Sequence, residues 1–313
     1  MADVKKIATR VSLGNGLTEL AAEHKDFVVM DADVAMATMT HTFRSAYPER
    51  HIDCGIAEAN MMSMAAGIAT TGKVPFVCAF AMFVAGRAFE QVRNSIGYPH
   101  LNVKICSTHG GISAGEDGAS HQCNEDLTLM RTIPGMTVIC PSDDIEAKAA
   151  LKAAYEMEGP VYLRFGRQPV AVINDTPDYS FTIGKGRVMR EGSDVALIAC
   201  GIMVHEALSA AELLAEKGIQ ARVINMPTIK PLDDELVLAA AKDCKKIVTV
   251  EEHSVLGALG SAVCELLSEK MPTPVKRIGM QDCFGESGPA LALLEKYGLS
   301  GNRIAETVEN WLK

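Results

Sequence analysis

A single acidic side chain stands at the head of a strongly apolar segment of this 313-residue sequence. The segment reads DCGIAEANMMSMAAGIA from Asp53 to Ala69, and Glu58 opens its apolar helical run. Small and apolar neighbours would exclude water from the carboxyl group, and burial raises the pKa of a carboxyl group because it disfavours the charged form. A raised pKa would suit Glu58 to proton exchange with a heterocyclic ligand. The structural alternative is an acid stabilised at a helix N-terminus by the helix dipole.

Two phenylalanines follow in the segment Phe80–Ile96, which reads FAMFVAGRAFEQVRNSI. Phe80 and Phe83, with the turn at 84–86, could present their ring faces to a flat ligand. Such stacking contributes roughly 0.5–1.5 kcal/mol per pair beyond the burial of area. Aromatic residues three positions apart are also common on a helix face that packs in the core. The segment therefore predicts either a stacking platform or ordinary core packing.

A glycine-rich polar loop, HGGISAGEDGASHQ, runs from His109 to Gln122 after an expected strand. Open α/β sheets bind their ligands at the carboxyl ends of strands, so His109, Asp117 and His121 are candidates for contacts to a hydroxylated substrate. The alternative is a solvated loop. The loop lacks the GxxxxGK[ST] pattern of a phosphate cradle, and the His, Cys and Glu of residues 121–125 fit no common zinc spacing. We therefore expect no metal ligands in this chain.

Two arginines end the expected last strand of the first half, in LRFGRQP at residues 163–169. The planar guanidinium group suits bidentate capture of a phosphate or a carboxylate. Arg164 and Arg167 are thus candidates for binding an anion, although a surface charge is the simpler interpretation of either one alone.

The order of apolar runs and helical patterns predicts a parallel sheet with helices on both faces. In the first half we expect strands at 27–30, 75–78, 103–106, 137–140 and 161–164, and helices at 59–70, 83–96 and 145–157. The pattern lapses at 171–192, which we interpret as a linker between a first domain at 1–170 and a second at 193–313. The second, smaller α/β domain has expected strands at 195–200, 221–225, 247–250 and 275–278 and helices ending near 217, around 234–241 and at 256–268.

Composition limits the possible functions. The net charge of −9 argues against a nucleic-acid surface, because binding to phosphates requires a basic footprint. The nine cysteines show no CxxC spacing, and the MADVKK start does not resemble a signal peptide, so we expect a reducing cytoplasm. The run from Ala59 to Gly86 carries Lys73 as its one charge, and Gly72 and Pro75 flank it. We interpret this run as a buried helix and a buried strand, not as a membrane span.

Taken together and in this order, the segments resemble the pyrimidine-binding domain of transketolases. GIAEANM is similar to the family's GIxEx₂M segment, HGGISAGEDGASHQ to its H-x₇-D-x₃-H loop, and GRQP to the arginine at its substrate entrance. The second half resembles the transketolase C-terminal domain in GIQARVI at 218–224, IKPLDDE at 229–235 and EEHSVLGALGSA at 251–262. The resemblance extends over essentially the whole chain and implies a pyrimidine-binding α/β domain, which opens with a helix at 9–23, followed by a smaller α/β domain.

This resemblance implies a thiamine-diphosphate-dependent transfer of a two-carbon ketol unit from a ketose to an aldose. Glu58 would then hydrogen-bond the pyrimidine ring nitrogen and promote activation of the cofactor. Phe80 and Phe83 would pack on the pyrimidine, and Asp33 in MDADVAMAT would lie near the cofactor.

The resemblance also implies substrate contacts. His109 and His121 would touch substrate hydroxyls or relay protons, and Asp117 would read the stereochemistry of a donor hydroxyl. Arg167 would bind an anionic tail. Family members often carry a serine near MDADxxxS that helps to hold a sugar phosphate, whereas this sequence has its first hydroxyl at Thr38. A phosphate tail is the favoured expectation, and a sulfonate is the alternative.

Nothing in the sequence matches the GDG…N segment with which family members bind the diphosphate and its metal. We therefore expect an N-terminal partner subunit that supplies this segment and holds Mg²⁺ or Ca²⁺, an α2β2 heterotetramer, and a chain that is the C-terminal subunit of a split transketolase. Two other functions stay open. One is the β subunit of a 2-oxo-acid dehydrogenase decarboxylating component, and the other is a non-catalytic interaction subunit of the same fold.

Overall fold

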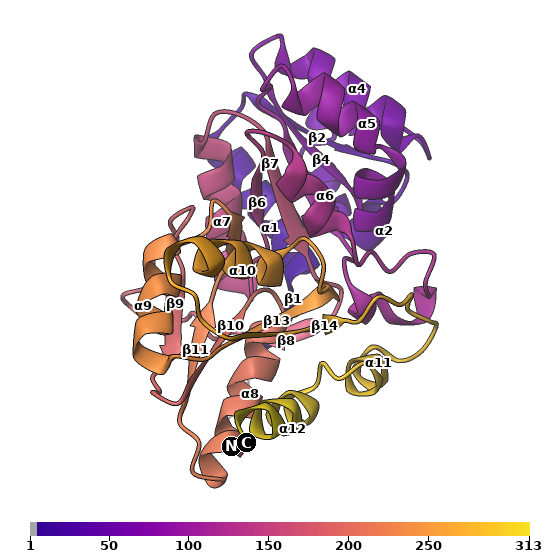
Figure 1. The fold of residues 1–313 in the computed structure, drawn as a ribbon. Coiled ribbons are helices and arrows are strands. Elements are labelled where there is room, and N and C mark those ends of the chain that lie inside the picture. The colour runs from indigo at the N-terminus through magenta and orange to yellow at the C-terminus, as the bar shows by residue number, and fades with distance from the viewer. Residues whose placement is uncertain (1–4) are drawn as a thin grey trace.

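The computed structural model describes residues 5–313 and arranges them around two large β-sheets, with a third sheet of only two strands (Figure 1). The larger sheet has the strand order β12-β6-β7-β5-β4-β2-β3. All of its strands pair in parallel except β12, which runs antiparallel to β6. The parallel strands are β2 (Phe27–Asp31), β3 (His51–Asp53), β4 (Val74–Phe80), β5 (Lys104–Thr108), β6 (Thr137–Ile139) and β7 (Val161–Phe165).

Helices cover both faces of this sheet, so the expected architecture is confirmed. On one face Leu13 and Leu17 of one helix and Leu151 of another pack against Phe27 and Phe76 of the strands. The opposite face packs against other helices in a separate apolar cluster. The helices of this half are α1 (Thr9–Glu23), α2 (Ala35–Thr38), α3 (His41–Ala46), α4 (Glu58–Ala69), α5 (Phe89–Gln91), α6 (Asp126–Thr132) and α7 (Asp144–Glu156).

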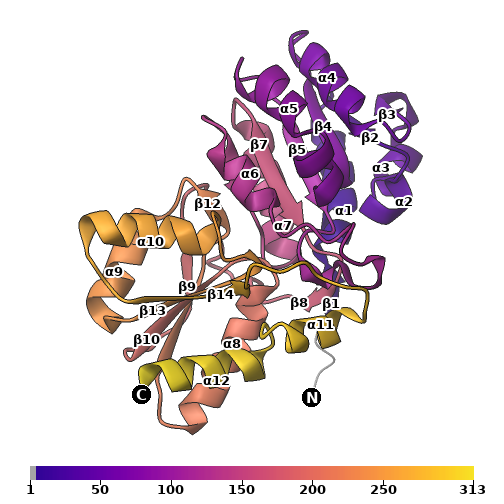
Figure 2. The same ribbon diagram turned by 45° about the vertical axis from the view of Figure 1, so that its right-hand side comes forward.

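The smaller sheet has the order β14-β13-β10-β11-β9, parallel except for the pairing of β9 with β11. Its strands are β9 (Arg187–Arg190), β10 (Val195–Ala199), β11 (Ala221–Asn225), β13 (Ile247–Ser254) and β14 (Val275–Met280). Its helices are α8 (Met203–Glu216), α9 (Asp234–Cys244), α10 (Leu259–Lys270), α11 (Ala290–Lys296) and α12 (Gly301–Leu312). Helix α12 packs against α8 (Figure 2).

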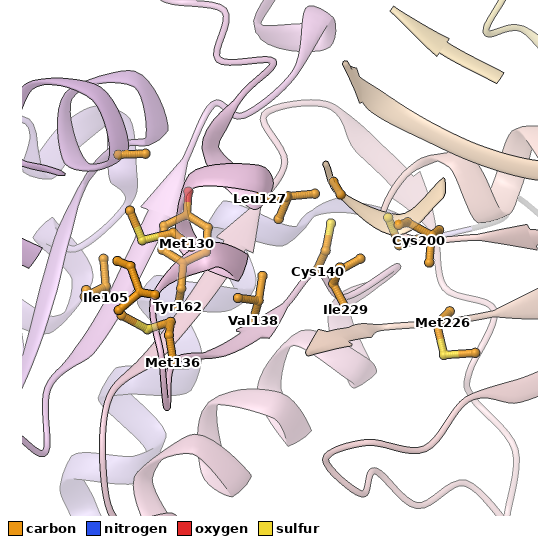
Figure 3. Close-up of a cluster of buried hydrophobic side chains, with 14 of the residues drawn as sticks. Ile105, Leu127, Met130, Met136, Val138, Cys140, Tyr162, Cys200, Met226 and Ile229 are labelled. Carbon is orange, nitrogen blue, oxygen red and sulfur yellow. The ribbon is translucent and has the colours of Figure 1, made fainter. Parts of the chain in front are cut away.

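One apolar core continues from the first sheet into the second. Figure 3 shows Val138 and Tyr162 of the larger sheet in the same cluster as Cys200 and Met226 of the smaller half. The strand β12 (Thr228–Lys230) also crosses over, because it belongs to the second half of the sequence but pairs with β6. The two halves are therefore packed on each other.

Three local features differ from the sequence-based expectations. The expected helix at 83–96 is divided into π-helical segments, Met82–Arg87 and Val92–Gly97, on either side of α5. The expected linker contains β9, which completes the second sheet. Short strands such as β3, β12 and the antiparallel pair of β1 (Lys6–Ala8) with β8 (Pro169–Ala171) were not expected, since three residues are too few to show a period.

The apolar run 59–86 forms α4 and the buried strand β4, as expected. None of the helices formed by residues 5–313 combines the length and the apolar character needed to cross a bilayer.

Candidate active site

The carboxyl ends of β4 and β5 bring two of the expected residues together. The strands pair in parallel, with Phe80 opposite Thr108, so the last residue of β4 lies beside the residue that precedes His109. Neighbouring parallel strands end at the same edge of a sheet, which is where α/β proteins bind ligands. Strand pairing thus positions the aromatic segment against the polar loop.

Four rings form a cluster at this edge. The Phe80 ring stacks on His109 with centroids 4.0 Å apart, and Phe83 meets His121 edge-on at 5.2 Å. The planes of Phe80 and Phe83 differ by only 15°, with centroids 6.1 Å apart. Both phenylalanines are half-buried and contact histidines, so part of each ring stays accessible at this edge of the sheet.

Glu58 begins α4 and is buried, with 3 % of its surface exposed. Its Oε2 accepts a hydrogen bond from Nη1 of Arg87 at 2.8 Å. The guanidinium carbon of Arg87 lies 4.6 Å from the centre of the Phe83 ring, at a cation–π distance. The burial expected from the small and apolar sequence neighbours is present, and in addition a cation from 29 residues further along the chain pairs with the carboxylate.

His109 lies at the base of the polar loop and has only 2 % of its surface exposed. Its φ of 61° places it in the left-handed region, which is uncommon for a residue with a side chain. Its Nδ1 lies 2.8 Å from Oγ1 of Thr108. Burial, followed by the positive charges of Arg10 and Arg167, lowers the pKa of His109 to about 3. His109 is therefore a neutral imidazole near neutral pH, able to exchange hydrogen bonds without carrying a charge.

The loop and the chain start enclose a basic recess. Arg167 donates hydrogen bonds to the carbonyl oxygen of Ala114 and, at 2.9 Å, to Oε2 of Glu116. Arg10 lines the same recess, and burial and the charge of Arg167 both lower its pKa. Arg10 Nη1 donates to the carbonyl oxygen of Ala37 at 2.8 Å, within the stretch where the family's serine is missing. Lys6, Arg10, Glu116 and Arg167 line this recess.

Arg164 does not share the recess. It is 3 % exposed and its Nε lies 3.1 Å from Oδ2 of the buried Asp126. The expectation that Arg164 is a candidate for anion capture is therefore wrong, because its charge is compensated inside the protein.

Asp33 and Asp117 are both exposed. Asp33 has a φ of 60°, and its backbone N–H donates to Oδ1 of Asp53 at 3.1 Å, just after β2 and β3. Asp117 lies at the end of the 3₁₀ segment Ile112–Asp117 of the polar loop, four residues before His121. Asp117 also lies near Arg10, and its negative charge partly offsets the lowering of the Arg10 pKa.

The side chains at this edge of the sheet fit the pyrimidine half of thiamine diphosphate. Glu58 Oε2 is held by Arg87, whereas Oε1 has no hydrogen-bond partner among residues 5–313 and is left to accept one from a ring nitrogen. The near-parallel faces of Phe80 and Phe83 suit a flat ring. Within the same residues, no group of three or more His, Cys, Asp or Glu side chains is arranged to hold a metal ion.

Sequence reasoning did not identify Arg87 and Arg10. A signal for Arg87 existed, because the long run before it contains only Lys73 as a charge, and a buried acid requires a nearby cation. Arg10 offered no comparable signal, since its neighbours at the recess come from the far end of the domain.

Comparison with known proteins agrees with this architecture. Residues 5–172 match the family model of the transketolase pyrimidine-binding domain, and residues 184–304 match that of the transketolase C-terminal domain. A 6-deoxy-6-sulfo-D-fructose transketolase subunit of Clostridium sp. (strain MSTE9) is 46 % identical over 92 % of this chain and 89 % of its own length. One of the subunits of an apulose-4-phosphate transketolase from Phocaeicola vulgatus is 38 % identical over 98 % of both chains.

A solved structure described as a split gene transketolase, inactive beta4 tetramer, is 48 % identical, with a TM-score of 0.89 over 98 % of this chain and 99 % of its own. Both domain models match in order, and these relatives are single subunits of about this chain's length. The chain therefore belongs to the transketolase family, in which it corresponds to the C-terminal subunit of split enzymes.

Proposed function

We propose that this chain forms the pyrimidine side of a thiamine diphosphate site in a two-chain transketolase, which transfers a two-carbon ketol unit from an anionic ketose to an aldose. The observation that carries the proposal is the juxtaposition of the buried Glu58 carboxylate, the paired faces of Phe80 and Phe83, and the two histidines beside them. Membership of the transketolase family indicates thiamine diphosphate as the cofactor, and these side chains are of the kinds that would contact its pyrimidine ring.

When bound, thiamine diphosphate supplies a nucleophilic carbon that can accept and release the two-carbon unit. Glu58 accepts a hydrogen bond from the pyrimidine ring and so holds a proton at that nitrogen. Arg87 keeps the Glu58 carboxylate in place at 2.8 Å. Phe80 and Phe83 orient the ring and exclude water from its faces. Each of these contributions depends on side chains that the structure already holds in position.

His109 and His121 act on the substrate side of the site. Stacking on Phe80 holds the His109 ring against the platform. As a neutral imidazole, His109 can donate one hydrogen bond and accept another, which suits a sugar hydroxyl or carbonyl. Asp117, exposed in the same loop, reads a hydroxyl group of the donor, and Asp33 lies at the cofactor edge.

Arg167 and the neighbouring Arg10 bind the anionic tail of the substrate. A guanidinium fork matches the oxygens of phosphate and of sulfonate equally well in shape. The two relatives illustrate both chemistries, since one is named for a sulfonated sugar and the other for a sugar phosphate. We favour phosphate because two arginines face the recess, and a dianion gains more than a monoanion from two cations.

The diphosphate and its Mg²⁺ are held by an N-terminal partner subunit, and the active assembly is an α2β2 heterotetramer. The solved relative described as an inactive tetramer of β chains supports a requirement for a second kind of chain. Ketol transfer should therefore appear only when both chains are present.

The test is reconstitution. This chain, a candidate N-terminal partner and their mixture are each assayed with thiamine diphosphate, Mg²⁺, a ketose phosphate and an aldose phosphate. The proposal expects turnover in the mixture alone. Turnover by this chain alone would contradict the two-chain site. Turnover of pyruvate or a branched 2-oxo acid instead of ketoses would favour the dehydrogenase subunit, and a stable but inactive mixture would favour an interaction subunit.

A further inference from the structure

The polar loop that carries His109 and His121 is closed at its neck. Gly110 and Cys123 form an isolated parallel bridge, and the backbone N–H of Gly111 donates to the carbonyl oxygen of Cys123 at 2.7 Å. His109 therefore lies immediately before the point where the loop returns to itself. Whatever determines the geometry of this neck also determines where the His109 ring can point.

A carboxylate from the C-terminal half reaches this neck. Glu252 of β13 is buried, and its Oε2 accepts a hydrogen bond from the backbone N–H of Ser113 at 3.0 Å. Gly111 has a φ of 80°, and a Cβ placed there would lie 2.5 Å from the carboxyl carbon of Glu252. The Glu252 side chain thus fills the space directly beneath the residue two positions after His109.

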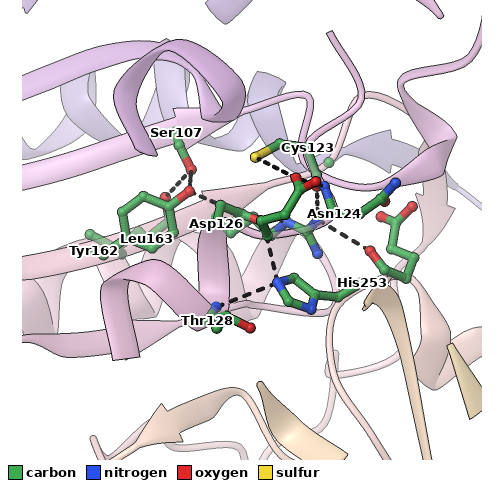
Figure 4. Close-up of polar contacts among 12 residues, drawn as sticks. Ser107, Cys123, Asn124, Asp126, Thr128, Tyr162, Leu163 and His253 are labelled. Carbon is green, nitrogen blue, oxygen red and sulfur yellow. Dashed lines mark hydrogen bonds and ion pairs between the residues drawn. The ribbon is translucent and has the colours of Figure 1, made fainter. Parts of the chain in front are cut away.

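Arg164 connects the same carboxylate residue to the loop. Its Nη2 donates both to the carbonyl oxygen of Cys123 at 3.0 Å and to that of Glu252 at 3.2 Å. Figure 4 shows this buried network around Asp126, which pairs with Arg164 and accepts a hydrogen bond from Tyr162 at 2.7 Å. A Cβ at Gly110 would lie 2.0 Å from Nε of Arg164. The neck is therefore enclosed by groups from β7 and β13.

The far side of the loop is tied to the C-terminal half as well. Nε2 of Gln122 donates to the carbonyl oxygen of Gly115 at 3.0 Å and to that of Glu286 at 2.8 Å. The loop is thus held from two directions, by Glu252 at Ser113 and Gly111 near its neck, and by the segment after β14 through Gln122, the last residue before Cys123. The neck contact lies much closer to His109 along the chain.

We infer that Glu252 is a positioning residue of the candidate active site, which acts through the Ser113 N–H and Gly111 to hold the His109 ring against Phe80. His109 adopts an uncommon left-handed backbone conformation, and such conformations persist only where the surroundings determine them. Catalytic groups must keep their geometry closely, since displacement by 1 Å can lower a rate about 100-fold. This inference rests on the proposed function.

The experiment uses the assembled two-chain enzyme with Glu252→Leu, which keeps the side-chain volume but removes the acceptor. The matched control is Glu251→Leu. Glu251 is the preceding residue, is also buried, and accepts from the backbone N–H groups of Leu259 and Gly260 instead of the loop. Successive side chains of a strand point to opposite faces. We expect kcat/KM for the donor to fall about 10- to 100-fold in Glu252→Leu and less than about threefold in Glu251→Leu.

Two readouts separate positioning from general damage. The affinity for thiamine diphosphate should change less than about threefold in Glu252→Leu, because Glu58 and the phenyl platform are not touched by Glu252. Glu252→Gln retains an amide oxygen that can accept from Ser113, so it should restore most of the activity.

The decisive measurement is a double-mutant cycle with His109→Ala. If Glu252 acts through His109, Glu252→Leu should lower kcat/KM by less than about twofold further when His109 is already alanine. Multiplication of the two losses would overturn the inference, as would a Glu252→Leu enzyme with unchanged kinetics. Should Glu252→Leu fail to assemble, Gly111→Ala perturbs the same contact from the loop side, and the same cycle applies to it.

Failure of the proposed function gives a different pattern. In that case the wild-type mixture shows no ketol transfer, or His109→Ala leaves ketol transfer intact. A clear loss in His109→Ala combined with normal rates in both Glu252→Leu and Gly111→Ala would contradict the positioning role alone.

Discussion

The imidazole ring of His109 stacks on the phenyl ring of Phe80, with 4.0 Å between their centroids and 28° between their planes. The two residues come from neighbouring strands whose carboxyl ends coincide, so the sheet itself sets their separation. The stacking covers the imidazole, and this burial is the largest cause of its lowered pKa.

His109 should consequently remain neutral throughout the physiological range. Its pKa of about 3 predicts no titration of its ring signals in NMR spectra between pH 5 and 8, with the signals assigned by comparison with His109→Asn. Phe80→Ala removes the covering ring, and we expect the pKa of His109 to rise by roughly one unit or more, since desolvation is relieved. A wild-type His109 signal that titrates near pH 6.5 would contradict this arrangement.

Glu58→Gln tests the cofactor contact. The change is nearly isosteric, so folding and assembly should survive, whereas turnover should fall at least about 100-fold, the scale of a positioned proton-transfer group. Glu90→Gln is the control, because Glu90 is exposed in the next segment and accepts hydrogen bonds from its near neighbours Gln91 and Asn94. Steady-state rates of the reconstituted enzyme check this prediction, and near-normal rates for Glu58→Gln would remove Glu58 from the mechanism.

Arg167→Ala tests the anionic tail. A hydrogen bond to a charged group contributes about 1.5–3 kcal/mol, which corresponds to a roughly 10- to 100-fold rise in KM for donors with a phosphate or sulfonate tail. Untailed donors such as xylulose or hydroxypyruvate should be affected much less. Arg93→Ala, at an exposed arginine that bonds to Asn94, is the control for charge alone. Equal losses on tailed and untailed donors would show that Arg167 has a structural role.

Glu251 should make the stability of the protein depend on pH. Burial raises the pKa of this carboxyl group to about 7. Between its ordinary pKa, near 4.5, and 7, the folded chain holds a proton that the unfolded chain has lost, so stability falls as pH rises through this window. At 1.36 kcal/mol per pKa unit, the free energy of unfolding falls by at most about 3 kcal/mol across this window.

Glu251→Gln cannot titrate and removes this contribution. The difference in the free energy of unfolding between Glu251→Gln and the wild type should therefore shift in favour of the variant as pH rises from 4.5 to 7, and level off above. Thermal denaturation at fixed protein concentration across this range measures it. Burial lowers the pKa of His253 to about 4, so this residue makes the protein more stable as pH rises. Because His253 is present in both proteins, its effect cancels in the difference. Parallel curves for the two proteins would refute the assignment.

The sequence by itself determined much of the fold. Strand β11 lies at 221–225 as predicted, because its short apolar run is a local property of the chain. Helix α1 also has the expected bounds, 9–23, which the family resemblance supplied. The order of the motif segments identified the family, and the family comparisons confirm it. Strand–helix alternation predicted a parallel sheet covered on both faces, which the structure has.

Tertiary structure alone decided which charges meet. Glu58 pairs with Arg87 across 29 positions, and Arg164 turns inward to Asp126 while Arg167, three residues later, reaches the recess. Both residues are arginines in one short segment, so only packing distinguishes them.

The longest connections were the least visible in the sequence. Glu252 meets the loop at Ser113 across 139 positions, and β12 leaves its own half to pair with β6. Periodicity reports which face of an element is buried, but not which distant element covers it. A contact between a buried carboxylate and a loop N–H depends on the docking of two separately formed sheets, and that docking is set by the shape of their shared core.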